Sequence, residues 1–316
     1  MNDRRKFLKT LAAVAAAGST AGLEVTRLDA QQRPAAAPAT SVTGIKKSAL
    51  INQLPRQLSY AERFAMARTA GFEAIEMQTI TRPEEAAEIK EASQKTGLRI
   101  HSVMNSAHWR SPMSSADPAV LKASVEGMET SLKNAALWGA DAVLLVPGVV
   151  DPANPYKDVW TRSQRAIRER LLPMAKDLKV VIAIEEVWNK FLLSPIEFAR
   201  YVDDFDSPFV KAYFDVGNVV LFAYPQDWIR TLGARIVKVH LKDFKLEKST
   251  YSWKNIGEGD IDWIECRKAL GEINYNGYVT TEVNGGDAAY LADLAGRVDK
   301  FLAGQKPFEP AAKPTV

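Results

Sequence analysis

The chain has 316 residues, 47% hydrophobic and 25% charged, which is typical of a folded globular protein. Its 41 basic residues exceed its 38 acidic ones, but residues 1–40 alone hold six basic and three acidic groups. The remainder is neutral, with 35 charges of each sign. This neutrality argues against a nucleic-acid binder and against a polybasic membrane-surface protein. The single cysteine, Cys266, excludes an internal disulfide and a thiolate-rich metal site.

The amino-terminal segment has the layout of an export signal. Basic residues including Arg4 and Arg5 precede a short, weakly apolar run over residues 8–18. The paired arginines resemble the bacterial twin-arginine signal, so we expect residues 1–30 to be a signal peptide of a periplasmic or extracellular protein. The run is shorter than the ~20 residues that span a bilayer, and no cysteine lies nearby, so we expect no stable membrane anchor. Residues 31–43, rich in Ala, Pro and Gln, predict a disordered linker.

From residue 44 onward, short apolar runs alternate with longer amphipathic segments. The apolar runs predict eight buried parallel strands, at residues 45–50, 74–77, 99–103, 142–146, 180–185, 210–215, 236–240 and 277–281. The amphipathic segments predict eight helices, at residues 58–69, 83–96, 118–137, 159–178, 195–202, 225–232, 263–273 and 288–302. Asp117-Pro118 and Ser194-Pro195 are typical helix starts, and Gly71 is one of several glycines placed where a helix would end.

Eight strand–helix units predict the α/β fold class and, within it, a single-domain (β/α)8 TIM barrel over residues 44–305. The alternative is a doubly wound parallel sheet, which has fewer units and a glycine-rich first turn. The first turn of this chain, near residues 46–48, has no such glycine pattern. Residues 306–316 are expected to form a carboxyl-terminal tail.

Four consecutive predicted strands deliver polar groups at their carboxyl ends: Glu185, Asp215, His240 and Glu282. The carboxyl ends of barrel strands meet at one mouth, so these side chains are expected to converge there. Three carboxylates and one imidazole suit one divalent metal ion such as Mn²⁺, Mg²⁺ or Co²⁺, with Zn²⁺ also possible. Without a cation the carboxylates would repel one another and raise one another's pKa.

Other polar and aromatic residues follow the same strand ends and are candidates for binding a substrate. Trp109 and Trp188 could stack on the apolar face of a sugar ring. The candidates are Glu76, His101, His108, Trp109, Trp188, Asn189, Asn218, Lys242, Asn255 and Glu258. Burial in the core or exposure at the rim is the alternative for each of them. The predicted loops 104–117, 147–158 and 244–261 are long enough to close over a substrate.

Several motifs, taken in order and spacing, resemble the xylose isomerase-like TIM-barrel superfamily of sugar isomerases and epimerases. The matching pieces are Ile-Glu185-Glu186-Val-Trp-Asn, Phe-Asp215-Val-Gly-Asn218, Val-His240-Leu-Lys-Asp243, Gly257-Glu258-Gly259 and Thr-Glu282-Val. The resemblance runs from about residue 44 to residue 304. It implies that Glu185, Asp215, His240 and Glu282 are the metal ligands, and that Glu185 and Glu282 also form the acid/base pair.

The double acid Glu185-Glu186 departs from the family, whose members often carry Glu-Asn at this place. In a strand, Val181, Ala183 and Glu185 share one face, so Glu185 is the expected ligand if that face lines the barrel. A register shift of one residue would exchange Glu185 for Glu186.

The resemblance and the ligand set together predict a divalent-metal-dependent isomerase or epimerase of an unphosphorylated ketose. In this chemistry one carboxylate removes a proton next to the carbonyl, and a metal-stabilised cis-enediolate forms. The site of reprotonation decides between epimer and isomer. Two alternatives stay open: a metal-dependent lyase or dehydratase acting on an oxidised sugar or polyol, and a non-catalytic sugar-binding protein. The expected partner is a small sugar, not nucleic acid. Leu221, Phe222 and Tyr224 leave open a homo-oligomer contact or a pocket wall.

Overall fold

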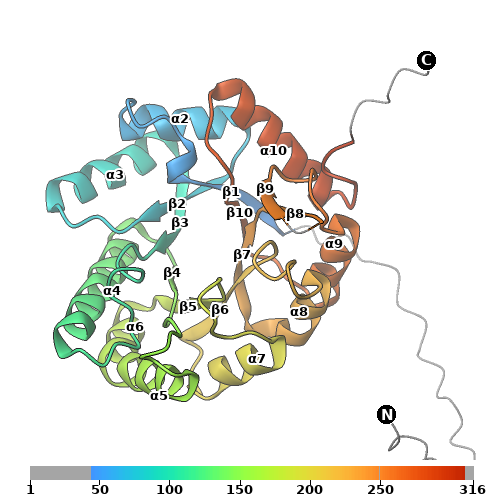
Figure 1. The fold of residues 1–316 in the computed structure, drawn as a ribbon. Coiled ribbons are helices and arrows are strands. Elements are labelled where there is room, and N and C mark those ends of the chain that lie inside the picture. Colours follow the sequence, from blue (N-terminus) through green and yellow to red (C-terminus); the bar gives the residue numbers. More distant parts are fainter. Residues whose placement is uncertain (1–43, 249, 310–316) are drawn as a thin grey trace, which may run out of the picture. The chain divides into compact units, whose positions relative to one another are not determined.

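A computed structural model describes residues 44–248 and 250–309 of the chain. Eight parallel strands close into a barrel in the order β1-β10-β7-β6-β5-β4-β3-β2, with helices around the outside (Figure 1). The TIM-barrel prediction is confirmed. The predicted signal peptide and linker at 1–43, and residues 310–316 of the predicted tail, lie outside the described residues.

The barrel strands lie within one residue of their predicted bounds at every end. They are β1 (Lys46–Leu50), β2 (Ala74–Gln78), β3 (Arg99–Met104), β4 (Ala142–Leu145), β5 (Val181–Glu185), β6 (Val210–Asp215), β7 (Ile236–Leu241) and β10 (Tyr278–Thr281). The helices are α2 (Tyr60–Ala70), α3 (Pro83–Thr96), α4 (Pro118–Trp138), α5 (Tyr156–Ala166), α6 (Leu172–Leu178), α7 (Pro195–Asp203), α8 (Pro225–Leu232), α9 (Trp263–Glu272) and α10 (Ala288–Leu302). No helix in the described ranges has both the length and the apolar character needed to cross a membrane.

Local sequence signals explain where the helices begin and end. The side chains of Asp117 and Ser194 accept hydrogen bonds from backbone N–H groups in the first turns of α4 and α7. Gly71, Gly97 and Gly139 end α2, α3 and α4 with positive φ angles, as their placement in the sequence predicts.

Two segments differ from the prediction. The single helix expected at 159–178 is instead α5 and α6, joined by a π-helical turn at Ile167–Leu171. The loop expected at 244–261 contains an antiparallel hairpin, formed by β8 (Asp243–Glu247) and β9 (Thr250–Lys254). In Figure 1 this hairpin lies between the barrel mouth and α10.

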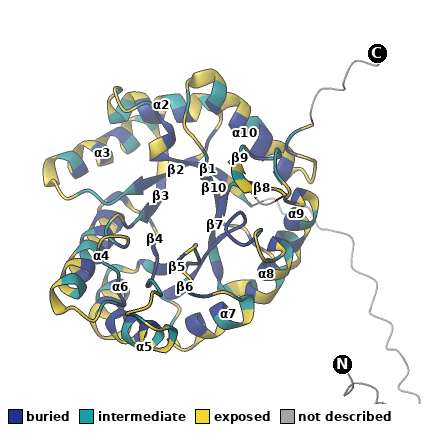
Figure 2. Ribbon diagram, viewed as in Figure 1, coloured by how far each residue is buried: buried dark blue, intermediate teal, exposed yellow. Residues whose placement is uncertain are grey.

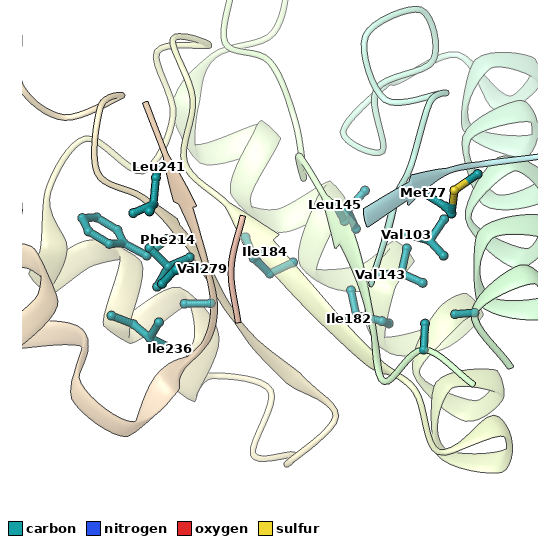
Figure 3. Packing of buried hydrophobic residues seen from close by; sticks show 14 of the residues in the cluster. Met77, Val103, Val143, Leu145, Ile182, Ile184, Phe214, Ile236, Leu241 and Val279 are labelled. Carbon is teal, nitrogen blue, oxygen red and sulfur yellow. The ribbon is translucent and has the colours of Figure 1, made fainter. Parts of the chain in front are cut away.

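The main hydrophobic core is the layer between the strands and the surrounding helices. Buried side chains such as Val103, Val143, Ile182 and Ile184 leave the strands toward the helices (Figure 3). Around the whole ring, the strands and the inward faces of the helices are buried, and the outer faces of the helices are exposed (Figure 2). The barrel therefore holds the strand ends in fixed positions.

The barrel interior has an apolar side and a polar side. Ala142, Leu144 and Ala183 from β4 and β5 form a buried apolar cluster with the ring of Tyr213. The polar side comes from four of the other strands, β2, β3, β7 and β10. Its buried members are Glu76, His101, Lys238, His240 and Thr280.

Candidate metal centre and active site

The four predicted ligands converge at the carboxyl-terminal mouth of the barrel. Glu185 and Asp215 are the last residues of β5 and β6, His240 is the penultimate residue of β7, and Glu282 directly follows β10. One ligand atom from each lies within 4.8 Å of those of the other three. Glu185, Asp215 and His240 are buried and Glu282 is partly exposed. The donor set of three carboxylates and one imidazole fits a divalent cation.

The imidazole of His240 has a different partner at each nitrogen. Nδ1 faces the ligand set, at 3.1 Å from Glu185 Oε1 and 3.5 Å from Glu282 Oε2. Nε2 lies 3.0 Å from Oε2 of Glu76, which also accepts a hydrogen bond from the Tyr213 hydroxyl. A carboxylate behind a metal-binding histidine fixes its tautomer and ring orientation. Glu76 is thus placed behind His240 rather than at the mouth, where the sequence predicts a substrate contact.

Lys242 lies among the same carboxylates, two residues beyond His240. Its Nζ is 3.0 Å from Asp215 Oδ2 and 2.7 Å from Glu282 Oε2. Burial alone would lower the pKa of Lys242, but the two carboxylates outweigh burial and raise it. For Glu282 the directions are reversed: burial alone would raise its pKa, but Lys242 and His240 lower it to about 2.

For the other two carboxylates of the cluster, burial has a larger effect on the pKa than the neighbouring cations have. Burial raises the pKa of Glu185 to about 7, although His240 partly opposes the shift. Burial also raises the pKa of Asp215 to about 6, with Lys242 opposing. Glu185 and Glu282 thus lie in environments that shift their pKa values in opposite directions.

The structure distinguishes the two adjacent acids. Glu185 pairs with Tyr213 in the sheet register and joins the ligand cluster. Glu186 turns away, and its Oε1 accepts a hydrogen bond from the backbone N–H of Asp215 at 2.9 Å. Glu185 therefore belongs to the cluster, and Glu186 supports the end of β6.

Two of the candidate asparagines hold loops in place. Asn189 donates to the carbonyl of Gly148 at 2.6 Å and is buried. Asn218 donates to the carbonyl of Glu186 at 2.8 Å, and its own carbonyl accepts from Trp188 Nε1. The Trp188 ring itself remains partly exposed.

The two remaining histidines do not join the ligand cluster. His101 is fully buried in the barrel, where it stacks on Tyr278 with ring centroids 4.4 Å apart and contacts Thr280. Burial lowers the pKa of His101, and it lowers that of His108 to about 4. His108 lies in the loop after β3 with its ring against exposed Trp109.

A cavity of about 800 Å³ opens beside the ligand cluster. Its floor includes Glu282 and Lys242, and the predicted Glu258 lies in its wall. Other wall residues, absent from the predicted set, come from the hairpin, the start of the loop after β10, and α10: Trp253, Asn284, Tyr290, Asp293 and Arg297. Two sequence signals mark these residues. Tyr251 and Trp253 alternate along β9, and the α10 residues are spaced to share one helix face.

The loop that carries Glu258 is held in place by contacts on two sides. The Asp243 carboxylate accepts hydrogen bonds from the Gly257 backbone and from Trp263 Nε1, both at 2.9 Å. On the outside, the Phe308 ring lies 4.3 Å from the Arg297 guanidinium. A Cβ added to Gly257, which has a φ of +89°, would meet the Phe308 backbone nitrogen at 2.7 Å. The last described residues of the chain thus support the cavity wall.

Comparisons with known proteins agree with this architecture. The model of the family "Xylose isomerase-like TIM barrel" matches residues 64–300. The chain is 29% identical over 242 residues to the L-ribulose-5-phosphate 3-epimerase UlaE of Escherichia coli, covering 71% of this chain and 82% of UlaE.

Solved structures share the fold. One is described as a D-tagatose 3-epimerase-like protein, with a TM-score of 0.70, 20% identity, and coverage of 82% of this chain and 97% of that one. Another is the D-allulose 3-epimerase from Methylomonas sp., with a TM-score of 0.65, 20% identity, and coverage of 82% and 98%. The long family match, together with the barrel, shows that the chain belongs to the xylose isomerase-like TIM barrel family.

Proposed function

We propose that this protein is a divalent-metal-dependent sugar epimerase or isomerase whose substrate is an unphosphorylated ketose. The observation that carries the proposal is the buried cluster of Glu185, Asp215, His240 and Glu282, with its four ligand atoms within 4.8 Å of one another. The relatives named above are described as sugar 3-epimerases, which favours epimerisation.

The proposed chemistry divides between a cation and two carboxylates. A divalent ion held by the four ligands would polarise the ketose carbonyl and acidify the neighbouring C–H. Glu185 and Glu282 are the acid/base pair: one removes that proton, and the other returns a proton to the same carbon from the opposite face. Glu76 and Tyr213 hold the His240 ring in position for the ion.

The charges around the cavity favour a substrate without a phosphate. Two of the three basic side chains that line the cavity face carboxylates: Lys242 contacts Glu282 at 2.7 Å, and Arg297 contacts Glu258 at 2.8 Å. The third basic side chain in the lining is Lys254. A phosphate group would have to compete with these carboxylates for the same cations.

The test is hydrogen exchange with solvent, together with elemental analysis of the purified protein. We expect one divalent ion per chain, and metal-loaded protein with a ketose in D₂O should place deuterium at C3 and give the epimer. Deuterium at C1 or C2 would identify an isomerase, and loss of water a lyase. Absence of bound metal after purification without chelators would overturn the metal site.

The export prediction extends the proposal to where the enzyme works. Arg4 and Arg5 precede the apolar run in the sequence, and an exported enzyme would meet sugars outside the cytoplasm. Cell fractionation of the full chain and of an Arg4→Lys/Arg5→Lys variant tests this. The unaltered chain should be found outside the cytoplasm and the variant inside it.

A further inference from the structure

We propose that the cavity beside the metal centre is a subsite for a second sugar ring, so that the substrate is a ketose carrying a glycosidic sugar. The inference rests on the proposed function, since it assigns the reacting ketose to the four ligands. It adds a distinct binding site and a narrower class of substrate. Three features carry it: continuity with the ligand cluster, an aromatic wall, and a charge-balanced polar wall.

The cavity is continuous with the ligand cluster. Glu282 belongs to both, and Lys242, which contacts Asp215 and Glu282, lies on the cavity floor. At about 800 Å³ the cavity is near the top of the range of about 300–1,000 Å³ that suits drug-sized ligands. A single ketose is smaller than such ligands. A ketose held at the ligands would leave most of this space for another group.

One wall presents an aromatic surface that other rings hold in place. The Trp253 side chain is 45% exposed although it lies in the cavity wall. Its ring centroid is 5.0 Å from that of Trp188 and 5.5 Å from that of buried Phe244. The Lys242 ammonium lies 4.9 Å from the Trp253 ring. An indole fixed in this way offers a flat apolar surface, which matches the C–H face of a sugar ring.

The rest of the wall is polar and suits a neutral, hydroxyl-rich ligand. Asn255, Asn284 and Tyr290 offer both hydrogen-bond donors and acceptors. Arg297 lies between two carboxylates, at 2.8 Å from Glu258 and 2.7 Å from Asp293. The whole lining balances three basic side chains against three acidic ones, so it provides hydrogen bonds without favouring an anion. They are Lys242, Lys254 and Arg297, and Glu258, Glu282 and Asp293. A flat apolar surface facing such groups fits a sugar ring better than an apolar ligand or a phosphate.

The experiment compares a free ketose with disaccharides that contain it. D-fructose, isomaltulose and lactulose each have a fructose unit with a potentially free carbonyl, and kcat/KM is measured from deuterium exchange in D₂O. We expect at least one disaccharide to exceed fructose about ten-fold. Trp253→Ala should lower kcat/KM for that disaccharide about five-fold and leave fructose nearly unchanged, in keeping with the strength of ring contacts.

Three further variants control for indirect effects. Trp253→Phe should recover part of the loss, because it restores a smaller aromatic face. Tyr290→Ala tests the α10 wall independently and should also act on the disaccharide alone. Tyr224→Ala is the matched surface control, because Tyr224 is 69% exposed and lies outside the cavity lining. An equal preference for fructose and disaccharides, or equal losses on both in the wall variants, overturns the subsite and leaves the proposed function intact.

The proposed function can also fail while the subsite remains testable. If none of the three sugars exchanges deuterium, the proposed ketose chemistry fails, and the subsite is tested by binding alone. Saturation-transfer NMR with methyl α-D-glucopyranoside should then show binding to the unaltered chain and loss of binding in Trp253→Ala. Absence of binding, or binding that survives Trp253→Ala, would overturn the subsite.

Discussion

The two sides of the barrel interior differ in the kind of side chain they bury and in what those side chains contact. On the β4–β5 side, Leu144 and its neighbours fill space with apolar side chains. The side formed by β2, β7 and β10 buries polar groups that have hydrogen-bond partners. These groups are Glu76, His240 and Thr280. Tyr213 belongs to both, since its ring packs with Leu144 and its hydroxyl donates to Glu76.

This contrast shows how a buried polar site is supported. A buried polar group is costly unless it is hydrogen-bonded, so each group on the polar side depends on a specific neighbour. The apolar side depends on volume and tolerates exchange between residues of similar shape. We therefore expect substitutions on the polar side to change chemistry and metal binding, and those on the apolar side to change stability alone.

The largest effect is expected in the ligand cluster at the mouth of the barrel, above both sides. Glu185→Gln keeps the shape of the side chain and removes a ligand charge and a proton-transfer group. We expect deuterium exchange to slow by about 10³-fold, within the usual range for general acid/base groups. Glu186→Gln is the matched control, because an amide oxygen can still accept from the Asp215 N–H. Full activity of Glu185→Gln would refute the acid/base assignment.

On the apolar side, Leu144→Ala should lower the free energy of unfolding by about 3 kcal/mol, because it opens a cavity in a fully buried cluster. Metal affinity should stay within about two-fold of the unaltered protein. Urea denaturation measures the first quantity and metal titration the second. A large loss of metal affinity would show that the two sides are not independent.

Lower on the polar side, Glu76→Gln should weaken metal binding about 10- to 100-fold, because His240 Nε2 loses its charged partner. Tyr213→Phe removes only the hydroxyl that donates to Glu76 and should have a smaller effect in the same direction. Metal titration by calorimetry compares the two variants. Unchanged affinity in Glu76→Gln would mean that the carboxylate does not orient the ring.

The smallest effect concerns His108, which lies outside the ligand cluster. Burial lowers the pKa of His108 to about 4, below its usual value near 6.5. The unfolded chain therefore binds this proton more readily, and its contribution to stability is present above pH 6.5 and lost as pH falls toward 4. Between pH 7 and pH 5.5 the protein should lose about 1 kcal/mol more unfolding free energy than a His108→Gln variant. Equal slopes for the two proteins would contradict the neutral state of His108.

The barrel and the convergence of the four candidate ligands were predictable because strand periodicity and strand ends are local features of the sequence. Side-chain alternation favoured Glu185 over Glu186 only on the condition that its strand face lines the barrel, so the sequence left both acids open. The position of Glu76 could not be predicted, since its contact with His240 crosses the barrel interior between β2 and β7. Sequence order does not determine which inward side chains meet across that space.

Fewer of the residues that line the cavity beside the ligand cluster could be predicted, for a related reason. Its walls combine a hairpin in a segment expected to be a loop with one face of the last helix. The alternation of Tyr251 and Trp253 was visible, but short exposed strands carry a weaker signal than buried ones. Arg297 lay in a correctly predicted helix, and only the packing of α10 beside the mouth brings it into the cavity wall.

The contact of Phe308 with Arg297 and Gly257 has a practical consequence for handling the protein. Helix α10 ends at Leu302, and a truncation there would leave the eight strand–helix units intact. It would also remove the side chain that covers Arg297, next to the carboxylates that line the mouth. An affinity tag is therefore better joined beyond residue 309, and shortened versions of the protein should be compared by substrate kinetics as well as by folding.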